Sequence, residues 1–301
     1  GMDDRGANST VQSVWARPID NSPSGQPILG RVVGGLVHCR LSDRVFSSRH
    51  LPPDTESAMI DEKDWSYFNQ HGYVLIKGVL QGDHLRSIQQ SFNEVWEAEP
   101  APRNQHKLLK YRSFIDLVEH PLILENHRAI FGSQTQLLQY DLLRQGPGND
   151  GPDRSWHRDF SFPGDAPLSI NTILYLDEMT PERGPTHVLP GSHRGWRQPP
   201  TGEERQQPLE GEVAVIAEPG DAAFINSAIW HSGGINRSEG LRRGIYLYFG
   251  HWWLKRYEWQ QEIPWQALEN ADEQRLQLLG LRQPGDLHIY PPDAVRNRDL
   301  V

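Results

Sequence analysis

Residues 156–159 read Trp156-His157-Arg158-Asp159, which places a histidine and a carboxylate two positions apart. In an extended strand, residues i and i+2 point to the same side, so His157 and Asp159 can reach one metal ion while Arg158 points elsewhere. Two histidines and one carboxylate bind Fe(II) on one face of an octahedron and leave the opposite face open. Far downstream, His231 supplies the second histidine. The pattern therefore predicts an iron centre formed by His157, Asp159 and His231.

His231 has rivals for this role, namely His187, His193, His251 and His288. His231 is favoured because it ends an apolar, strand-like run, 222–230. A ligand at the mouth of a strand is held by a rigid sheet and still meets solvent and substrate. His193 lies in a Pro-Gly-Ser-His turn, where a structural hydrogen bond is the simpler expectation.

A second strand, 242–249, begins eleven residues after His231 and carries a candidate anchor. Alternation divides it into a polar face with Arg242, Gly244, Tyr246 and Tyr248, and an apolar face with Arg243, Ile245, Leu247 and Phe249. A guanidinium binds a carboxylate through two parallel hydrogen bonds. Arg242 is therefore predicted to anchor a dicarboxylate co-substrate. Strand parity admits only one of the two arginines to the pocket, and Arg243 is the competitor.

The wider pattern predicts a mainly β fold with helical buttresses, arranged as a jelly-roll or cupin-like double-stranded β-helix. Short strands separated by turns are expected at 137–144, 169–176, 186–189, 212–217, 222–230 and 242–249. Helices gather earlier: one ends at Gly72, and another lies between Pro121 and Gly132. A final amphipathic helix is expected from Trp265 to about Gly280. Residues 1–58 read as an extension that wraps the core or is partly disordered, and 59–301 as a single domain.

Composition argues against several classes of protein. The net charge is −9 without a Lys/Arg-rich run, which argues against a nucleic-acid partner. No apolar run reaches about 18 residues, so no membrane span is expected. The first residues lack a secretory pattern, and the single cysteine, Cys39, fits a reducing compartment, so a cytoplasmic location is expected. The sequence leaves a monomer and a homodimer equally open.

The order of several motifs resembles the phytanoyl-CoA dioxygenase family of Fe(II)/2-oxoglutarate-dependent oxygenases. The resemblance covers roughly residues 65–281 and rests on 69–74, 156–159, 176–178, 183–185, 189–193 and 219–221, with His231 and Arg242. It implies that His157, Asp159 and His231 are iron ligands and that Arg242 binds the C5 carboxylate of 2-oxoglutarate. The implied reaction uses O2, releases succinate and CO2, and hydroxylates an unactivated C–H of a small-molecule metabolite.

Two other functions stay open on this scaffold: a Zn- or Mn-dependent hydrolase, and a non-catalytic metabolite-binding protein. The resemblance itself bears on the reaction type. Related halogenases carry a small residue in place of the carboxylate so that chloride can bind iron, and Asp159 therefore favours hydroxylation.

Several further side chains are candidates for the pocket. The family commonly has a serine two positions after the distal histidine, but here the order is His231-Ser232-Gly233, which leaves the contact of Ser232 with the co-substrate open. Polar strand residues that could donate to the co-substrate are Gln139, Asn171 and Thr172. Candidate substrate contacts are Trp156, Arg158, Phe160 and Phe162, with core packing equally expected for Trp156. Arg158, together with Arg154, Arg194 and Arg197, suggests an anionic or polar substrate.

Overall fold

The computed structural model describes residues 59–133, 135–160, 162, 165–194 and 200–281. The predicted N-terminal extension, 1–58, lies outside these residues, as does His288.

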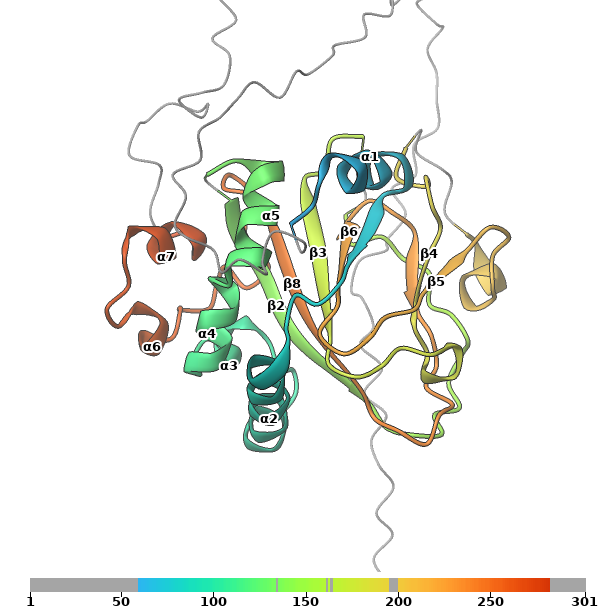
Figure 1. Cartoon of the computed structure of the whole chain (residues 1–301), viewed down its shortest axis with the longest axis horizontal. Coiled ribbons are helices and arrows are strands. Elements are labelled where there is room, and N and C mark those ends of the chain that lie inside the picture. The colour runs from blue at the N-terminus through green and yellow to red at the C-terminus, as the bar shows by residue number, and fades with distance from the viewer. Residues whose placement is uncertain (1–58, 134, 161, 163–164, 195–199, 282–301) are drawn as a thin grey trace, which may run out of the picture. The chain divides into compact units, whose positions relative to one another are not determined.

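Two antiparallel sheets build the core (Figure 1). The larger has five strands in the order β1-β6-β3-β8-β2, and the smaller has three in the order β5-β4-β7. The larger sheet consists of β1 (Tyr73–Ile76), β2 (Thr135–Gln145), β3 (Ser169–Tyr175), β6 (Ala222–Asn226) and β8 (Arg242–His251). The smaller consists of β4 (Thr186–Val188), β5 (Val213–Val215) and β7 (His231–Gly233). Neighbouring strands come from distant parts of the sequence, which is typical of a jelly roll. The predicted double-stranded β-helix core is confirmed.

Helices cover one face of the larger sheet, and the smaller sheet lies on the other side (Figure 1). The α-helices are α1 (Glu62–His71), α2 (Gly82–Ala98), α3 (Gln105–Leu108), α4 (Arg112–Val118), α5 (Pro121–Phe131), α6 (Trp265–Leu268) and α7 (Glu273–Leu278), and the short 3-10 helices are η2 (Pro181–Arg183) and η3 (Gly202–Gln206). α1 ends at Gly72, whose φ of 84° suits a left-handed cap, and Pro121 and Gly132 bracket α5 as predicted.

Each face of the larger sheet buries its own set of side chains. In β8, Ile245, Leu247 and Phe249 pack into the core beneath the helices. Tyr246 points the other way and packs with Ile173 of β3 in the core between the sheets. We call this second side the inter-sheet face. The alternation means that a residue's parity in its strand decides whether it meets the helices or the interior of the jelly roll.

Two sequence-based boundaries were wrong. The run 222–230, expected as one strand, is a strand only over β6, which ends at Asn226. Residues 227–230 form a turn, and the next strand, β7, begins at His231 in the other sheet. The predicted C-terminal helix is two short helices, because Asn270 takes a left-handed conformation with φ 54° and breaks the helix between them.

Gly220, in the turn before β6, should be the costliest glycine to replace. Its φ is +93°, and an added Cβ would lie 2.0 Å from the carbonyl oxygen of Leu80. Gly220→Ala is expected to lower the free energy of unfolding by about 3 kcal/mol or more, measured by urea denaturation. Gly211→Ala is the matched control, because Gly211 also has a positive φ (+81°) but nothing lies within 4 Å of its Cβ position. The control should lose only about 1–2 kcal/mol. Equal losses in both variants would contradict the steric argument.

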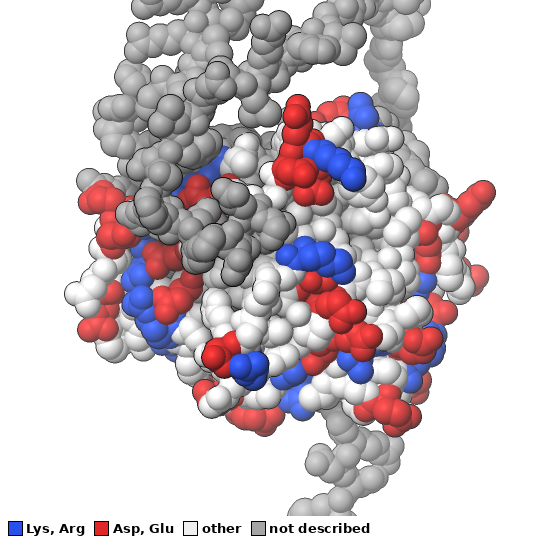
Figure 2. Space-filling model, viewed as in Figure 1, with Lys and Arg blue, Asp and Glu red and all other residues white. Residues whose placement is uncertain are grey.

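The surface carries charges of both signs. On the face shown in Figure 2, acidic and basic side chains of the described residues are interspersed and form no continuous basic patch. Within the described part of the chain, no helix combines the length and the apolar character needed to cross a bilayer.

Candidate metal centre

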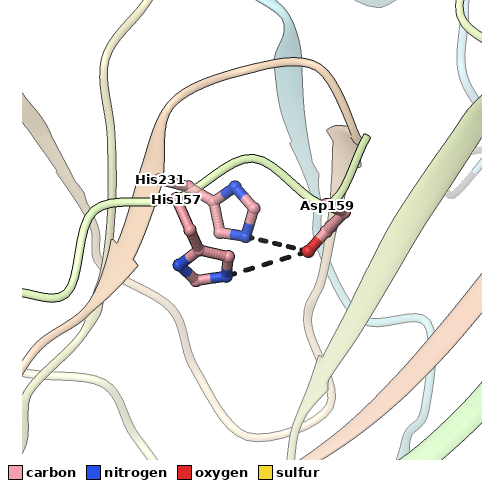
Figure 3. A group of neighbouring side chains, drawn as sticks. All are labelled: His157, Asp159 and His231. Carbon is pink, nitrogen blue, oxygen red and sulfur yellow. Dashed lines mark ion pairs between the residues drawn. The ribbon is translucent and has the colours of Figure 1, made fainter. Parts of the chain in front are cut away.

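His157, Asp159 and His231 converge at one end of the jelly roll. The backbones of His157 and His231 form an antiparallel bridge with two N–H···O bonds of 3.0 Å, which places the two imidazoles 4.2 Å apart by ring centroids. Nε2 of each ring faces the same carboxylate oxygen of Asp159, at 3.7 Å for His157 and 3.6 Å for His231 (Figure 3). The three ligand atoms all lie within 4.8 Å of one another. Two cis ligands, each about 2.1 Å from a metal ion, would be about 3 Å apart, so the group needs only a small contraction to hold one.

Backbone carbonyls fix the orientation of both imidazoles. Nδ1 of His157 lies 2.8 Å from the oxygen of Ser155, and Nδ1 of His231 lies 3.1 Å from the oxygen of Ile229. A carbonyl can only accept, so Nδ1 carries the proton and the lone pair of Nε2 is left for a metal. Burial lowers the pKa of His231 to about 4, which keeps this ring neutral at pH 7. The donor set and its tautomers therefore fit a divalent cation such as Fe(II).

The group is open on one side only. The side chain of His157 keeps 48% of its area exposed, whereas those of Asp159 and His231 keep 8% and 5%. Among the described residues, this is the only group of three or more possible ligand side chains close enough to share a metal ion. The rival His193 instead places Nε2 3.2 Å from the carbonyl of Asn69, as a structural histidine would.

Asn171 supports the carboxylate of the group. It lies on the inter-sheet face of β3, and its Nδ2 donates to Oδ2 of Asp159 at 3.4 Å. Its neighbour Thr172 points to the opposite face, where its hydroxyl lies 2.9 Å from Nε2 of His127 in α5. The expectation that Thr172 contacts the co-substrate was wrong, because strand parity turns its side chain toward the helices.

This pair of neighbours gives a matched test. Asn171→Ala should raise the Kd for Ni(II) by about 10- to 100-fold, since outer hydrogen bonds orient the ligands of a metal. Thr172→Val should lower stability by about 1 kcal/mol and leave the Kd for Ni(II) unchanged. Isothermal titration with Ni(II) measures both. A Kd for Asn171→Ala equal to that of Thr172→Val would rule out the supporting role.

Arg242 is a buried cation at the start of β8. It is 2% exposed, and its Nη1 donates to the carbonyl of Gly234 at 3.4 Å. Within the described residues, no ion pair involves Arg242. A buried guanidinium without a counter-ion is costly, so an anionic ligand would relieve a cost already present in the fold. Arg243 points to the helix-covered face and forms two hydrogen bonds with the carboxylate of Asp177, at 2.7 and 3.0 Å.

Ser232 does not face Arg242 or the metal group. Its hydroxyl accepts the N–H of Ser155 at 2.7 Å and donates to the carbonyl of Gly233 at 2.9 Å. The sequence left the contact of Ser232 with the co-substrate open, and the structure speaks against it, because Ser232 has opposite parity to His231 in β7. Gly233 occupies the favourable parity instead, and a Cβ there would lie 3.5 Å from Nη1 of Arg242.

Trp156 and Arg158 also face away from the centre, although their segment forms only an isolated bridge at His157 and no regular strand. Trp156 is 1% exposed, packs with Leu189 and Trp230, and donates its indole N–H to the carbonyl of Gln207 at 2.8 Å. Arg158 donates to the carbonyl of Ser192 at 2.6 Å and lies 4.7 Å from the centroid of the Trp230 ring. The expectation that these two residues contact substrate was wrong. Both pack behind the metal group and stabilise the segment that carries it.

Two of the four arginines that suggested an anionic or polar substrate are paired with acids. Arg154 binds Glu212 at 2.5 Å, and Arg194 lies 3.7 Å from Asp165. Arg197 lies outside the described residues. This set therefore gives no support for an anionic substrate.

The mouth of the centre is aromatic. The ring of Phe160 packs edge-to-face on Tyr257 with centroids 6.2 Å apart, and the hydroxyl of Tyr257 donates to the carbonyl of Asp159 at 3.3 Å. Phe162 is 52% exposed. Phe160 and Phe162 thus remain candidates for substrate contact, and Tyr257 is an additional one that the sequence did not indicate.

Gln139 and Asp141 share the inter-sheet face of β2, and the amide of Gln139 donates to the carboxylate of Asp141. This bond ties up a side chain that was expected to bind the co-substrate. Asp141 was not predicted as a site residue, although its position two residues after Gln139 places it on the same face of the strand. Burial, with the negative charges of Glu258 and Asp159 adding to it, raises the pKa of Asp141 to about 7.

The raised pKa predicts a pH-dependent effect of Asp141→Asn in the metal-free protein. Between about pH 4 and pH 7 the folded protein keeps a proton that the unfolded chain releases, so wild-type stability falls as pH rises through this range. An asparagine at this position does not ionise, so Asp141→Asn does not lose stability in this way as pH rises. The gain in stability of Asp141→Asn over wild type should therefore grow from pH 5 to pH 8 in thermal melts. A constant difference across the range would show that the carboxyl is not perturbed.

Comparison with known proteins gives consistent matches. The family described as "Phytanoyl-CoA dioxygenase (PhyH)" matches residues 68–244. Dioxygenase trt7 of Aspergillus terreus is 27% identical over 251 residues, covering 74% of this chain and 84% of the relative. The Fe(II)/2-oxoglutarate-dependent dioxygenase nvfF of Aspergillus novofumigatus is 25% identical over 265 residues, covering 77% and 84%. The crystal structure of HygX from Streptomyces hygroscopicus with nickel, 2-oxoglutarate and hygromycin B aligns with a TM-score of 0.55 at 17% identity, covering 65% of this chain and 90% of HygX. HygX thus shares the fold.

Proposed function

The chain belongs to the phytanoyl-CoA dioxygenase family and is an Fe(II)/2-oxoglutarate-dependent dioxygenase, and we propose that His157, Asp159 and His231 hold its iron. Their convergence on one point, with both Nε2 atoms facing one carboxylate oxygen, carries this proposal. When bound, iron together with 2-oxoglutarate and O2 supplies the oxidising power to hydroxylate an unactivated C–H, and succinate and CO2 are released. The backbone carbonyls of Ser155 and Ile229 hold the two imidazoles in the ligating tautomer.

Arg242 is proposed to bind the C5 carboxylate of 2-oxoglutarate. Gly233, where an added Cβ would lie 3.5 Å from the guanidinium, comes two residues after His231 in the same strand. Two residues of strand span about 6.6 Å, a distance suited to a five-carbon dicarboxylate with its other end at the metal. The buried cation then gains the anionic partner that the described residues do not supply.

The substrate is proposed to enter beside His157, the exposed member of the group, and to contact Phe160 and Tyr257. The HygX structure contains a small molecule, hygromycin B, and we propose a small-molecule substrate here as well. Aromatic rings at the mouth exclude water from the reacting carbon and hold the apolar part of a ligand.

Anaerobic titration of the Fe(II)-loaded protein with 2-oxoglutarate tests the proposal. A visible charge-transfer band should appear, and admission of O2 should then yield succinate even without substrate, as slow uncoupled turnover. The Zn- or Mn-dependent hydrolase alternative requires neither signal, and would instead cleave ester or amide probes without 2-oxoglutarate. Absence of both band and succinate in iron-loaded protein would refute the proposed assignment.

A further inference from the structure

A surface hollow lies between α3 and the segment that follows β8. It is lined by residues of both, among them Gln105, His106, Arg256 and Glu258. The segment after β8 also reaches the metal group, because Tyr257 donates its hydroxyl to the carbonyl of Asp159 at 3.3 Å. One short segment thus contacts the proposed iron site through Tyr257 and lines the hollow through its next residue, Glu258.

Gln105 is a buried amide without a partner. It is 2% exposed, and neither Nε2 nor Oε1 makes a hydrogen bond in the described structure. A buried amide that is left unsatisfied costs about 1–3 kcal/mol, which is unusual unless a ligand or water completes it. Gln105 is also one of the residues that line the hollow.

Hydrogen-bond acceptors extend from the hollow toward the metal group. The backbone of Asn104 bridges to Asp141 of β2, which brings α3 next to this carboxylate. Glu258 accepts the backbone N–H of His106 at 3.1 Å. Besides burial, the charges of Glu258 and Asp159 both raise the pKa of Asp141, so Asp141 lies near a carboxylate of the hollow and near the carboxylate of the metal group. Among the described residues, neither Asp141 nor Glu258 forms an ion pair with a basic side chain.

Arg256 also lines the hollow and offsets part of the negative charge. Two carboxylates, those of Glu258 and Glu262, line the hollow, and Arg256 is its single arginine or lysine. The balance therefore favours a ligand group that donates hydrogen bonds over one that carries negative charge.

We propose that Gln105, Asp141 and Glu258 form a specificity subsite that binds a hydroxyl- or amine-bearing end of the substrate while its reacting C–H lies at the metal. This inference rests on the proposed function and narrows its substrate class. Of the anionic or polar substrate that the sequence suggested, it selects the polar alternative, with an end that donates hydrogen bonds.

Three matched probes test the subsite: cyclohexylmethylamine, cyclohexylmethanol and cyclohexanecarboxylate. Their Kd values are measured by ligand-observed NMR on protein loaded with Ni(II) and 2-oxoglutarate, which binds ligands without turnover. Wild type should bind the amine and the alcohol at least about tenfold more tightly than the carboxylate, the effect of one charge-assisted hydrogen bond. Asp141→Asn/Glu258→Gln should lose about tenfold in affinity for the amine and less for the alcohol, which an amide can still accept.

Glu269→Gln is the matched control, because it removes one negative charge from an exposed position at the end of α6. It should change none of the three Kd values. Persistence of amine binding in the double variant, or a preference of wild type for the carboxylate, overturns the subsite. Thermal melts verify that the double variant is folded. Binding of 2-oxoglutarate to wild type, measured in the same samples, tests the proposed function separately, so a failure of the subsite alone is recognisable.

Discussion

Replacing His231 with alanine is expected to lower 2-oxoglutarate-dependent succinate formation by roughly 1,000-fold or more, equivalent to about 4 kcal/mol of lost transition-state stabilisation. His231 is the buried member of the group and the one whose ring is held neutral by its surroundings. Its loss leaves one imidazole and one carboxylate, which cannot define a face of an octahedron. The effect should therefore appear in metal binding as well as in activity.

Metal binding gives a readout that does not depend on turnover. Ni(II) at 100 times its Kd should stabilise wild type by about 2.7 kcal/mol, seen as a rise in melting temperature. His231→Ala should show almost no rise. His84→Ala is the control, since His84 is an exposed residue of α2 on the helical layer and its ring stacks on His120. A normal Ni(II) response in His231→Ala would refute the role of this residue.

Alternation of side-chain direction accounts for the convergence of His157 and Asp159 that the sequence predicted, although 156–159 form only an isolated bridge and no regular strand. The same alternation that pairs His157 with Asp159 also turns Trp156 and Arg158 toward Trp230. The sequence alone could therefore have predicted that these two side chains do not enter the pocket. Parity alone does not say which face of a strand is the interior. Asn171 and Thr172 are polar neighbours, and only the packing of α5 onto β3 decides that Asn171 faces the metal group.

Contacts between distant segments explain what sequence reasoning missed. Asp141 and Glu258 come together only because the segment after β8 folds back over β2, where Tyr257 N–H donates to the carbonyl of Leu138 at 3.0 Å. No periodic pattern in the sequence predicts that this segment folds back over β2. Likewise, the apolar pattern did not show that β6 ends at Asn226, because the turn at 227–230 is itself mostly apolar.

Arg242→Gln is expected to raise the KM for 2-oxoglutarate by about 100-fold or more, in line with the 2–5 kcal/mol lost when one partner of a buried charge pair is removed. The guanidinium is held at the sheet interior with a carbonyl of Gly234 as its hydrogen-bond acceptor. A glutamine there can donate one neutral hydrogen bond in place of two charge-assisted ones. At saturating 2-oxoglutarate, kcat should fall much less than kcat/KM, because the C5 carboxylate is remote from the reacting atoms.

Arg243→Gln is the matched control. We expect Arg243→Gln to lower stability with little effect on the KM for 2-oxoglutarate, and Arg242→Gln to do the reverse. Arg243 binds Asp177 on the helix-covered face, with both side chains mostly buried, so its loss leaves a carboxylate without its partner and should destabilise the fold by about 3 kcal/mol. Arg242 forms no ion pair among the described residues, so Arg242→Gln removes an uncompensated buried charge and should leave the ligand-free protein at least as stable as wild type. Urea denaturation without 2-oxoglutarate, combined with KM measurements, separates the two. If Arg243→Gln rather than Arg242→Gln raised the KM for 2-oxoglutarate, the co-substrate would be anchored on the other face of β8 and the assignment would be wrong.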